Sequence, residues 1–253
     1  MKIAVCIKQV PTREWQPRLN DDKTWIRDQD VSYEMNEPDA YALEESLRLR
    51  EKHGGEVVVC SAGPTRVQQV IREALARGAD RALHVEDDAL GAADAFTAAA
   101  AMTAAMADQK FDLILTGLQS DDQGHAQFGP VLAEKLGIPH STIIMEVNVD
   151  GSNLKVKREL EGGWFQYVSM PLTALLTIQS GINQLRYATL KGIMAAKKKE
   201  ITKVPAPAGL SPRNKVIALH APQKSKKTVM IGGSPAEAAK ELVKRLREEA
   251  RVL

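Results

Sequence analysis

The sequence predicts an α/β protein built on a doubly wound, mostly parallel sheet with helices on both faces. Short apolar runs rich in β-branched residues, such as IAVCI and EVVVCS, alternate with longer amphipathic or Ala-rich stretches. This alternation is typical of βαβ units, whose strands are buried on both faces of the sheet. Ligands of such sheets bind beyond the carboxyl ends of the strands. We therefore expect a site in the loops that follow Cys6, Cys60 and Leu115.

Strands and helices are expected to alternate over the first half of the chain. The expected strands are the apolar runs at residues 1–10, 56–61, 81–85 and 111–117. The expected helices cover residues 36–53, 67–78, 94–108 and 126–136. Pro38 and Asp39 suit a first helical turn, and Gly78 and Gly137 suit helix ends. The polar residues 12–32 predict an irregular excursion with room for a small hairpin.

The pattern changes from about residue 140 onwards. Alternating residues on both sides of a DG dipeptide predict an added β-hairpin over residues 143–170. Residues 171–180 predict a fifth strand that returns to the main sheet. Residues 181–209 contain few core-forming side chains and predict an extended linker. The segment SPAE near the C-terminus predicts a capping box at the start of a final helix, whose apolar side needs a surface to cover.

Composition and charge exclude several classes of protein. The 34 basic and 32 acidic side chains nearly cancel, so no overall field attracts nucleic acid or a membrane. Cys6 and Cys60 both lie in apolar runs, which is typical of reduced thiols in an intracellular protein. No apolar run reaches the roughly 18 residues that a membrane span needs. We therefore expect a cytoplasmic protein that binds no nucleic acid and does not insert into a membrane.

The common enzyme motifs are missing from the sequence. It contains no G-x-x-x-x-G-K-[ST], no G-x-G-x-x-G after a strand and no G-x-S-x-G. The five histidines stand at no metal-ligand spacing from one another or from cysteine. We therefore expect neither a catalytic residue nor a metal site.

The densest polar cluster is LQSDDQGHAQFG, residues 118–129, between an expected strand and an expected helix. Backbone N–H groups and a helix N-terminus are suited to a phosphate, and Ser120, Gln123 and Gln127 add neutral hydrogen-bonding groups. Asp121 and Asp122 suit a phosphate less well and would instead cap the helix or face a ribose hydroxyl. A surface loop with a helix cap explains the same residues equally well.

A second cluster, AAKKKEITK at residues 195–203, is strongly basic. Aromatic residues for base stacking are nearly absent and the overall charge is close to neutral, which disfavours nucleic-acid binding. A solvated or partner-facing segment is the better interpretation.

Several motifs together resemble the β subunit of electron-transfer flavoproteins over essentially the whole chain. They are KIAVCIKQVP, MNEPDAYALEESLRLRE, VVVCSAGP, IREALARGAD, the 118–129 loop followed by PVLAEKLGIP, and VKRELEGG. The most specific is LTIQSGINQLRYATLKGIMAAKKKEI at residues 176–201. The resemblance implies a heterodimer with an α subunit that holds most of an FAD. Such a protein is an electron carrier rather than an enzyme with catalytic residues of its own.

The resemblance also implies that this chain binds AMP in a structural role. The implied nucleotide site consists of Cys6, Asn36, Glu37, Pro38, Asp39, Ala62, Leu118, Gln119, Ser120, Asp121, Asp122, Gln123, Gly124, His125, Ala126, Gln127, Phe128 and Gly129. Residues 1–190 would form the adenine-nucleotide-binding domain, including the hairpin. Residues 191–253 would form a partner-recognition segment, a linker and a C-terminal arm whose helix packs on the α subunit.

Partners are implied in the same way. Electrons would come from dehydrogenases such as an acyl-CoA dehydrogenase and pass to a downstream acceptor such as a membrane quinone oxidoreductase. The implied recognition segment, with Leu190 as a protruding apolar plug, consists of Arg186, Tyr187, Leu190, Ile193, Met194, Lys197, Lys198 and Lys199. Glu159 would pair with an arginine of the α subunit, and Arg13 stands where some relatives place a tyrosine near the flavin ring. Both are therefore expected at the contact between the subunits.

Two alternatives remain open for the ligand and the function. The loop ending Ala126-Gln127-Phe128-Gly129 resembles the electron-bifurcating branch, whose β subunit can hold a second FAD and oxidise NADH. That branch usually carries Asp-Gly-Asp-Thr where this chain has DQGH, so AMP is favoured and a second FAD stays possible. The other alternative is a stand-alone adenine-nucleotide-binding regulator, which would have little use for the long C-terminal arm.

Overall fold

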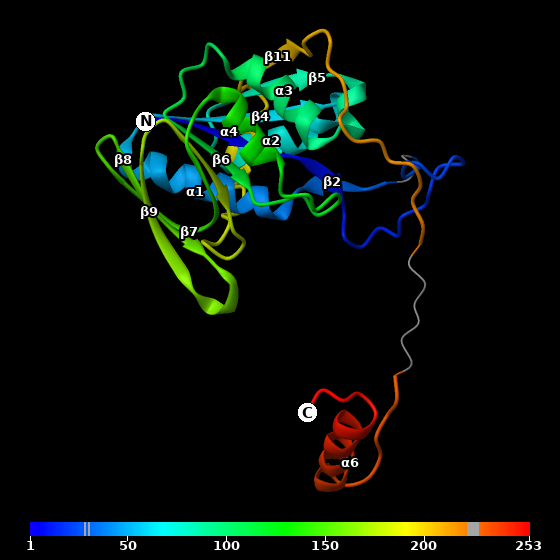
Figure 1. Ribbon diagram of the computed structural model, residues 1–253. Helices are drawn as coiled ribbons and strands as arrows, with labels where there is room; N and C mark the ends of the chain where they lie inside the picture. The colour runs from blue at the N-terminus through cyan, green and yellow to red at the C-terminus, as the bar shows by residue number, and fades with distance from the viewer. Residues whose placement is uncertain (28, 30, 222–227) are drawn as a thin grey trace. The chain divides into compact units, whose positions relative to one another are not determined.

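The computed structural model describes residues 1–27, 29, 31–221 and 228–253. Among these residues, nine strands form one sheet in the order β11-β5-β4-β1-β6-β10-β7-β8-β9 (Figure 1). The strands of this sheet are β1 (Lys2–Cys6), β4 (Glu56–Gly63), β5 (Arg81–Glu86), β6 (Leu113–Gly117), β7 (His140–Asp150), β8 (Asn153–Glu159), β9 (Phe165–Pro171), β10 (Ala174–Ile178) and β11 (Ile201–Pro205). The α-helices are α1 (Glu37–His53), α2 (Gln68–Arg77), α3 (Ala95–Met106), α4 (Phe128–Leu136), α5 (Leu190–Ala196) and α6 (Pro235–Glu248). A separate antiparallel ladder joins β2 (Gln9–Pro11) to β3 (Tyr33–Met35), and 3-10 turns lie at Thr65–Val67, Asp88–Ala92 and Glu161–Gly163.

The sheet confirms the predicted doubly wound α/β class. Every neighbouring pair of strands from β11 to β7 is parallel. The chain order reverses at β1, with β4 and β5 on one side and β6 and β10 on the other. Cys6 at the end of β1 lies in register with Cys60 of β4 and Thr116 of β6. The carboxyl ends of these three strands therefore meet beside the reversal point, where sheets of this kind bind ligands.

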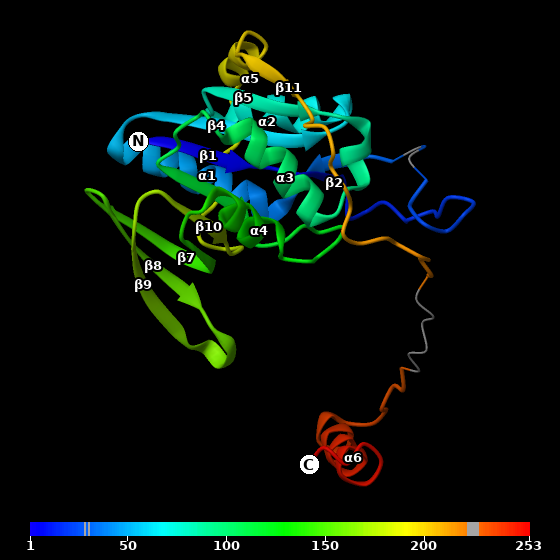
Figure 2. The ribbon, with the colours of Figure 1, turned by 45° about the horizontal axis from the view of Figure 1, so that its top comes forward.

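Helices cover both faces of the parallel strands (Figure 2). Because strand side chains alternate between the faces, Ile3 and Val5 belong to the apolar cluster of α1 and α2, whereas Ala4 and Cys6 belong to that of α3 and α4. Each large aliphatic side chain buried in these clusters contributes about 1.5–3 kcal/mol to folding. The Ala-rich sequence of α3 leaves little side-chain bulk between the helix and the strands.

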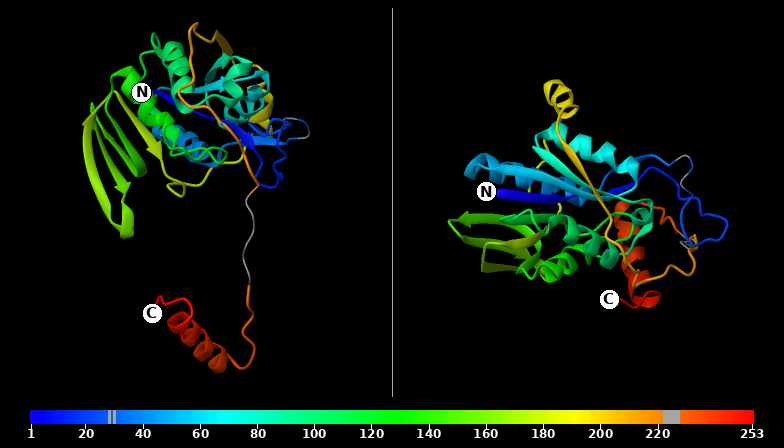
Figure 3. Two further views of the ribbon diagram at one scale, coloured as in Figure 1. Left: turned by 45° about the vertical axis from the view of Figure 1, so that its right-hand side comes forward. Right: turned by 90° about the horizontal axis from the view of Figure 1, so that it is seen from above.

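The predicted β-hairpin is present and is extended by a third strand. Strands β7, β8 and β9 form an antiparallel meander that continues the main sheet (Figure 3). Leu154 and Val156 of β8 are buried. On the other face, Lys157 of β8 lies over the ring of Phe165 on β9, with its Nζ 3.9 Å from the ring centroid. The meander therefore has one core face and one basic and aromatic face.

The prediction of an extended linker over residues 181–209 is wrong. Part of this segment forms α5, and another part forms β11, which pairs with β5 at the edge of the sheet. Helix α5 approaches α2 so closely that a Cβ added at Gly192 would lie 2.3 Å from the carbonyl oxygen of Ala76. Arg72 of α2 donates to two carbonyl groups at the end of α5, those of Ala196 and Lys199. The segment is thus attached by a close backbone approach and by hydrogen bonds, and it needs few large apolar side chains. For this reason it resembles a linker in sequence.

The chain divides into two compact units, Met1–Ala218 and Leu219–Leu253. This division lies later in the chain than the one expected after residue 190, since β11 belongs to the main sheet. The second unit contains α6, whose predicted capping box is confirmed. The Ser234 hydroxyl accepts from the backbone N–H of Glu237, and the Glu237 carboxylate accepts from the backbone N–H of Ser234.

One buried carboxylate joins α1 to the carboxyl ends of β1 and β6. Asp39 accepts from the backbone N–H of Lys8 at 2.7 Å and from that of Gly117 at 2.9 Å. Gly117 permits this contact because a Cβ there would lie 2.3 Å from the Asp39 Oδ1 atom and 2.7 Å from the Pro38 carbonyl carbon. The first turn of α1 is thereby held directly against the reversal point of the sheet.

We expect Gly117→Ala to lower the free energy of unfolding by about 1–3 kcal/mol, the usual effect of overpacking a close-packed site. The added methyl group meets backbone atoms of α1, which cannot move aside without displacing the helix. Urea denaturation of the variant against the parent chain measures the loss. Gly232→Ala is the matched control, since a Cβ at Gly232 meets nothing within 4 Å. Equal unfolding midpoints for the two variants would contradict the proposed close contact.

Candidate functional site

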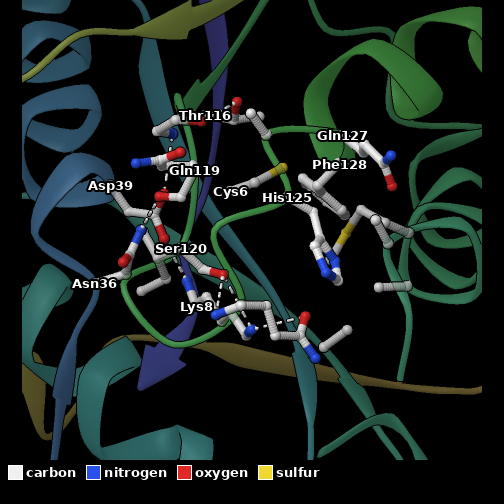
Figure 4. Close-up of a pocket in the computed structure, with 18 of the residues that line it drawn as sticks. Cys6, Lys8, Asn36, Asp39, Thr116, Gln119, Ser120, His125, Gln127 and Phe128 are labelled. Carbon is white, nitrogen blue, oxygen red and sulfur yellow. Dashed lines mark hydrogen bonds between the residues drawn. The ribbon is translucent and has the colours of Figure 1, made fainter. Parts of the chain in front are cut away.

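A pocket lies at the carboxyl ends of β1, β4 and β6, under the loop of residues 118–128 (Figure 4). Most of the residues expected at a nucleotide site line it. They are Cys6, Asn36, Asp39, Ala62, Leu118, Gln119, Ser120, Gln123, His125, Ala126, Gln127 and Phe128. The structure therefore brings together residues that lie as far apart in the sequence as Cys6 and Phe128.

Other expected site residues lie outside the pocket lining. Glu37 and Asp121 both pair with the Arg13 guanidinium, and Asp122 pairs with Lys8. Pro38 occupies the first turn of α1, and Gly124 has a left-handed φ of 63° in the loop. A Cβ added at Gly129 would lie 2.5 Å from the Thr177 Cγ2 atom. The absence of a side chain at Gly129 therefore allows α4 to approach β10.

Sequence reasoning missed several residues of the pocket. Lys8 lies just beyond the end of β1, and Thr116 and Gly117 end β6. The rule that ligands bind beyond the carboxyl ends of strands was sufficient to find these three. The remaining wall is apolar and is formed by Cys60, Leu90, Ala93, Ala95, Ala98 and Met102. An Ala-rich helix carries no motif, so sequence offered no signal for this wall.

The pocket has an apolar part and a polar part. The small and apolar side chains of the wall around α3, together with Phe128, leave a surface suited to a flat aromatic ring. In Figure 4, Lys8 and Ser120 lie together, away from Phe128. The Lys8 ammonium donates to the Asp122 carboxylate at 2.7 Å and to the Ser120 hydroxyl at 3.3 Å. The polar part is therefore suited to an anionic group attached to the ring.

The loop over the pocket is held by Asn36, which is buried just ahead of α1. Its side-chain amide donates to the Gln119 carbonyl group, and its side-chain carbonyl accepts from the backbone N–H of Asp121, both at 2.9 Å. An amide can do both because it carries a donor and an acceptor. Asn36 and Asp39 thus make the start of α1 the support for both the strand ends and the loop.

The N-termini of α3 and α4 differ in what they offer to an anion. Asp94 caps α3, accepting from the backbone N–H of Thr97 at 2.7 Å, so a carboxylate already occupies that helix start. Helix α4 begins after Ala126, whose φ is 52°, and Gln127. Within the described part of the chain, no side chain caps α4. Its first N–H groups are therefore the ones beside the pocket that are suited to a phosphate.

Three titratable groups that line the pocket are buried: Cys6, Cys60 and Asp39. Burial raises the pKa of the Cys6 thiol well above its ordinary value and that of Cys60 to about 12. Both thiols are consequently neutral at physiological pH and act as small apolar groups. Burial also raises the pKa of Asp39 to about 7, against the effect of the two backbone N–H groups that it accepts from. The two thiols are therefore poor nucleophiles, and Asp39 is occupied in holding the backbone around the pocket.

A second surface lies on α5. Thr189 caps this helix by accepting from the backbone N–H of Gly192 at 3.0 Å. Leu190, the first residue of the helix, is 78% exposed and Tyr187 is 90% exposed. Ile193 and Met194 are also exposed, and the residue spacing places both beside Leu190 on the helix. An apolar patch therefore projects from a helix that is anchored on α2.

Two charged residues of the expected recognition segment, Arg186 and Lys199, and Glu159 of the expected subunit contact are bound within their own chain. The Arg186 guanidinium makes a bidentate ion pair with Glu44 of α1, with both N–O distances 2.9 Å. Burial alone would raise the pKa of Glu44, but these bonds hold it below its ordinary value. The Lys199 ammonium donates to the carbonyl groups of Leu75 and Ala79 at the end of α2. Glu159, expected at the subunit contact, accepts from the Gln179 side-chain amide at 3.0 Å.

Residues 1–27, 29, 31–221 and 228–253 contain neither a cluster of metal ligands nor a helix that could cross a membrane. In that part of the chain, there is no cluster of three or more potential metal ligands from histidine, cysteine, aspartate or glutamate. The same residues include no helix with the length and apolar character of a membrane span.

Comparison with known proteins identifies the family of this chain. The model of the electron transfer flavoprotein domain family matches residues 23–209. The electron transfer flavoprotein subunit beta of Methylophilus methylotrophus is 36% identical, and the alignment covers 98% of each chain. The subunits beta of Bacillus subtilis (37% identical, over 90% of this chain and 91% of the relative) and Homo sapiens (34%, over 100% and 99%) are similar over almost the same length. The chain therefore belongs to the electron transfer flavoproteins, as a β subunit.

Proposed function

We propose that this chain pairs with an electron transfer flavoprotein α subunit and binds AMP in the pocket beside β1 and β6. The observation that carries the AMP assignment is the division of the pocket into an apolar wall around α3 and a polar part at Lys8. An adenine ring fits the former and a phosphate fits the latter, where the uncapped start of α4 adds N–H donors.

FAD would be held mainly by the α subunit and would supply the electron-carrying chemistry when bound. This chain's own residues would then complete the flavin site and shape the complex. Arg13 lies at the outer side of the loop, paired with Glu37 and Asp121, where it is exposed to solvent in the chain by itself. Glu159 ends β8 on the meander, with its carboxylate partly accessible. Both are available for contact with a second subunit.

The α5 patch is proposed as the docking site for dehydrogenases such as an acyl-CoA dehydrogenase, from which electrons pass on to an acceptor such as a quinone oxidoreductase. Leu190 is the main apolar contact, with Ile193, Met194 and Tyr187 around it. Lys197 and Lys198 are exposed beside the patch and would meet acidic groups of a partner. Arg186 and Lys199 support the patch from within, through their bonds to α1 and α2.

A second FAD in place of AMP, as in electron bifurcation, is the other candidate. The observation in its favour is the loop ending Ala126-Gln127-Phe128-Gly129, which forms the start of α4 beside the pocket. The replacement of Asp-Gly-Asp-Thr by DQGH weighs against it.

Cofactor content distinguishes these functions. After co-expression with its α subunit, the purified heterodimer is expected to be yellow and to release about one flavin and about one AMP on denaturation. Absorbance spectroscopy and chromatography of the released ligands give both numbers. About two flavins without AMP would favour bifurcation. A colourless heterodimer that releases no flavin would refute the electron-carrier function.

Leu190→Ala is expected to slow reduction of the heterodimer's flavin by a partner dehydrogenase by about tenfold to a hundredfold. Burial of a leucine at an interface contributes roughly 1.5–3 kcal/mol, which is a change of that size in affinity. The melting temperature should stay almost unchanged because the side chain is exposed in this chain.

Leu132→Ala is the matched control for that experiment, since Leu132 is fully buried in α4. It should cost about 2–5 kcal/mol of stability and leave the rate per folded heterodimer unchanged. If Leu190→Ala behaves like this control, the leucine is a packing residue and the docking site lies elsewhere.

A further inference from the structure

Arg186 lies in the irregular segment just ahead of α5 and of Leu190. Its guanidinium group makes four hydrogen bonds to two carboxylates of α1, two to Glu44 at 2.9 Å and two to Glu51. The backbone N–H of Arg186 also donates to Glu44, at 3.1 Å. Because a guanidinium group has only five N–H groups, almost all of its donors are directed at the protein's own chain.

Glu44 holds this arginine from a position that a partner protein cannot reach. Only 4% of the Glu44 side chain is exposed, against 31% of the Arg186 side chain. Glu44 also accepts from the Nε atom of Arg48 at 3.2 Å, one turn further along α1. A change at Glu44 can therefore affect docking only through the residues that Glu44 holds.

Three more hydrogen bonds attach the same segment to the helices beneath it. The Asn183 side-chain amide donates to the Tyr41 carbonyl group and to the Glu45 carboxylate of α1, both at 3.1 Å. The Arg77 guanidinium at the end of α2 donates to the Arg186 carbonyl group at 3.2 Å. The chain just ahead of α5 is thereby tied to both α1 and α2.

The ion pairs of Arg186 also determine which charge the segment presents to a partner. Two carboxylates face this one guanidinium group, so its positive charge is balanced within the chain. Lys197 and Lys198 are exposed at the other end of α5 and carry the charge that would attract an acidic partner. The bidentate pair with Glu44 fixes the orientation of Arg186 as well as its distance, which a lysine cannot do.

We propose that Glu44 is a positioning residue for the α5 patch, acting through Arg186, and that Arg186 supports the patch internally instead of contacting the dehydrogenase. This inference rests on the proposed docking function and adds how the patch is held. A side chain that projects from a fixed base loses less conformational freedom on binding than one on a loose segment. Loss of this base therefore weakens docking and leaves the flavin chemistry unchanged.

Kinetics with an acyl-CoA dehydrogenase of the same organism test the inference on the flavin-loaded heterodimer. Glu44→Gln keeps the length of the side chain and removes its charge and one acceptor oxygen. It should raise the KM for the heterodimer about fivefold to tenfold and leave kcat and reduction by dithionite unchanged. If Arg186 faced the partner, the sign would be opposite, because loss of the Glu44 charge would free the arginine and lower the KM.

A double-mutant cycle separates positioning from direct contact. Arg186→Lys keeps the charge and loses the bidentate pair, so it should raise the KM several-fold, by about threefold to tenfold. In a Leu190→Ala background it should have little further effect, because both changes act on the same patch. Separate contacts of Arg186 and Leu190 with the dehydrogenase would instead multiply their effects on the KM. Arg186→Lys also decides the matter if Glu44→Gln is unstable.

Glu56→Gln is the matched control, since it removes a carboxylate from another ion pair between elements of the main unit. Glu56 pairs with Arg81 at an N–O distance of 3.3 Å, and the pair joins the first residues of β4 and β5. This variant should leave both kcat and the KM unchanged. Melting curves establish that each variant is folded.

The outcomes separate this inference from the function on which it rests. An unchanged or lower KM for folded Glu44→Gln, or independent effects of Arg186→Lys and Leu190→Ala, overturns the inference and leaves the docking site standing. If Leu190→Ala alone leaves the KM unchanged, or the dehydrogenase does not reduce the parent heterodimer, the docking function itself is refuted.

Discussion

The bond network of Asp39 is the constraint on which the pocket and its surroundings depend. A single carboxylate holds the backbone beyond β1 and the last residue of β6, and it belongs to the first turn of α1. Without it, the buried N–H of Gly117 would lack a partner, which costs about 1–3 kcal/mol, and the half-buried N–H of Lys8 would lose its partner as well. Gly117 makes the arrangement possible by leaving room for α1. The strand ends, the helix start and the loop that Asn36 holds are therefore one connected structure.

Most of the parallel sheet could be predicted because its strands are continuous apolar runs that have no plausible place outside a core. Strand β11 could not be predicted in this way, because ITKVP is half exposed at the edge of the sheet. It is held there by pairing with β5, which is distant in the sequence. Helix α5 was missed for a related reason. Its buried contact comes from Ala196 and from the missing side chain of Gly192, and small residues produce no amphipathic pattern. Interactions made by backbone and small residues leave little trace in a sequence.

The same limit applies to predicting which polar and charged residues belong to the site. The polar loop is recognisable from its composition, whereas its partner Lys8 in the KQVP that follows β1 can be found only from its place beyond the carboxyl end of a strand. Arg186 and Lys199 present the opposite problem. Their charges suggest a partner protein, whereas the structure gives them carboxylate and carbonyl partners within the chain. Sequence identifies charged residues well and does not say which of them are already paired.

Helix α1 links the two proposed functional surfaces. Its first turn supports the pocket through Asp39, and further along Glu44 binds the Arg186 guanidinium ahead of α5. Since α1 has 17 residues, it spans roughly 25 Å as one rigid element. A ligand that stabilises the start of α1 therefore also stabilises the base from which Leu190 projects. If the proposed nucleotide binds here without taking part in electron transfer, its role would be to fix the scaffold that presents the proposed docking patch.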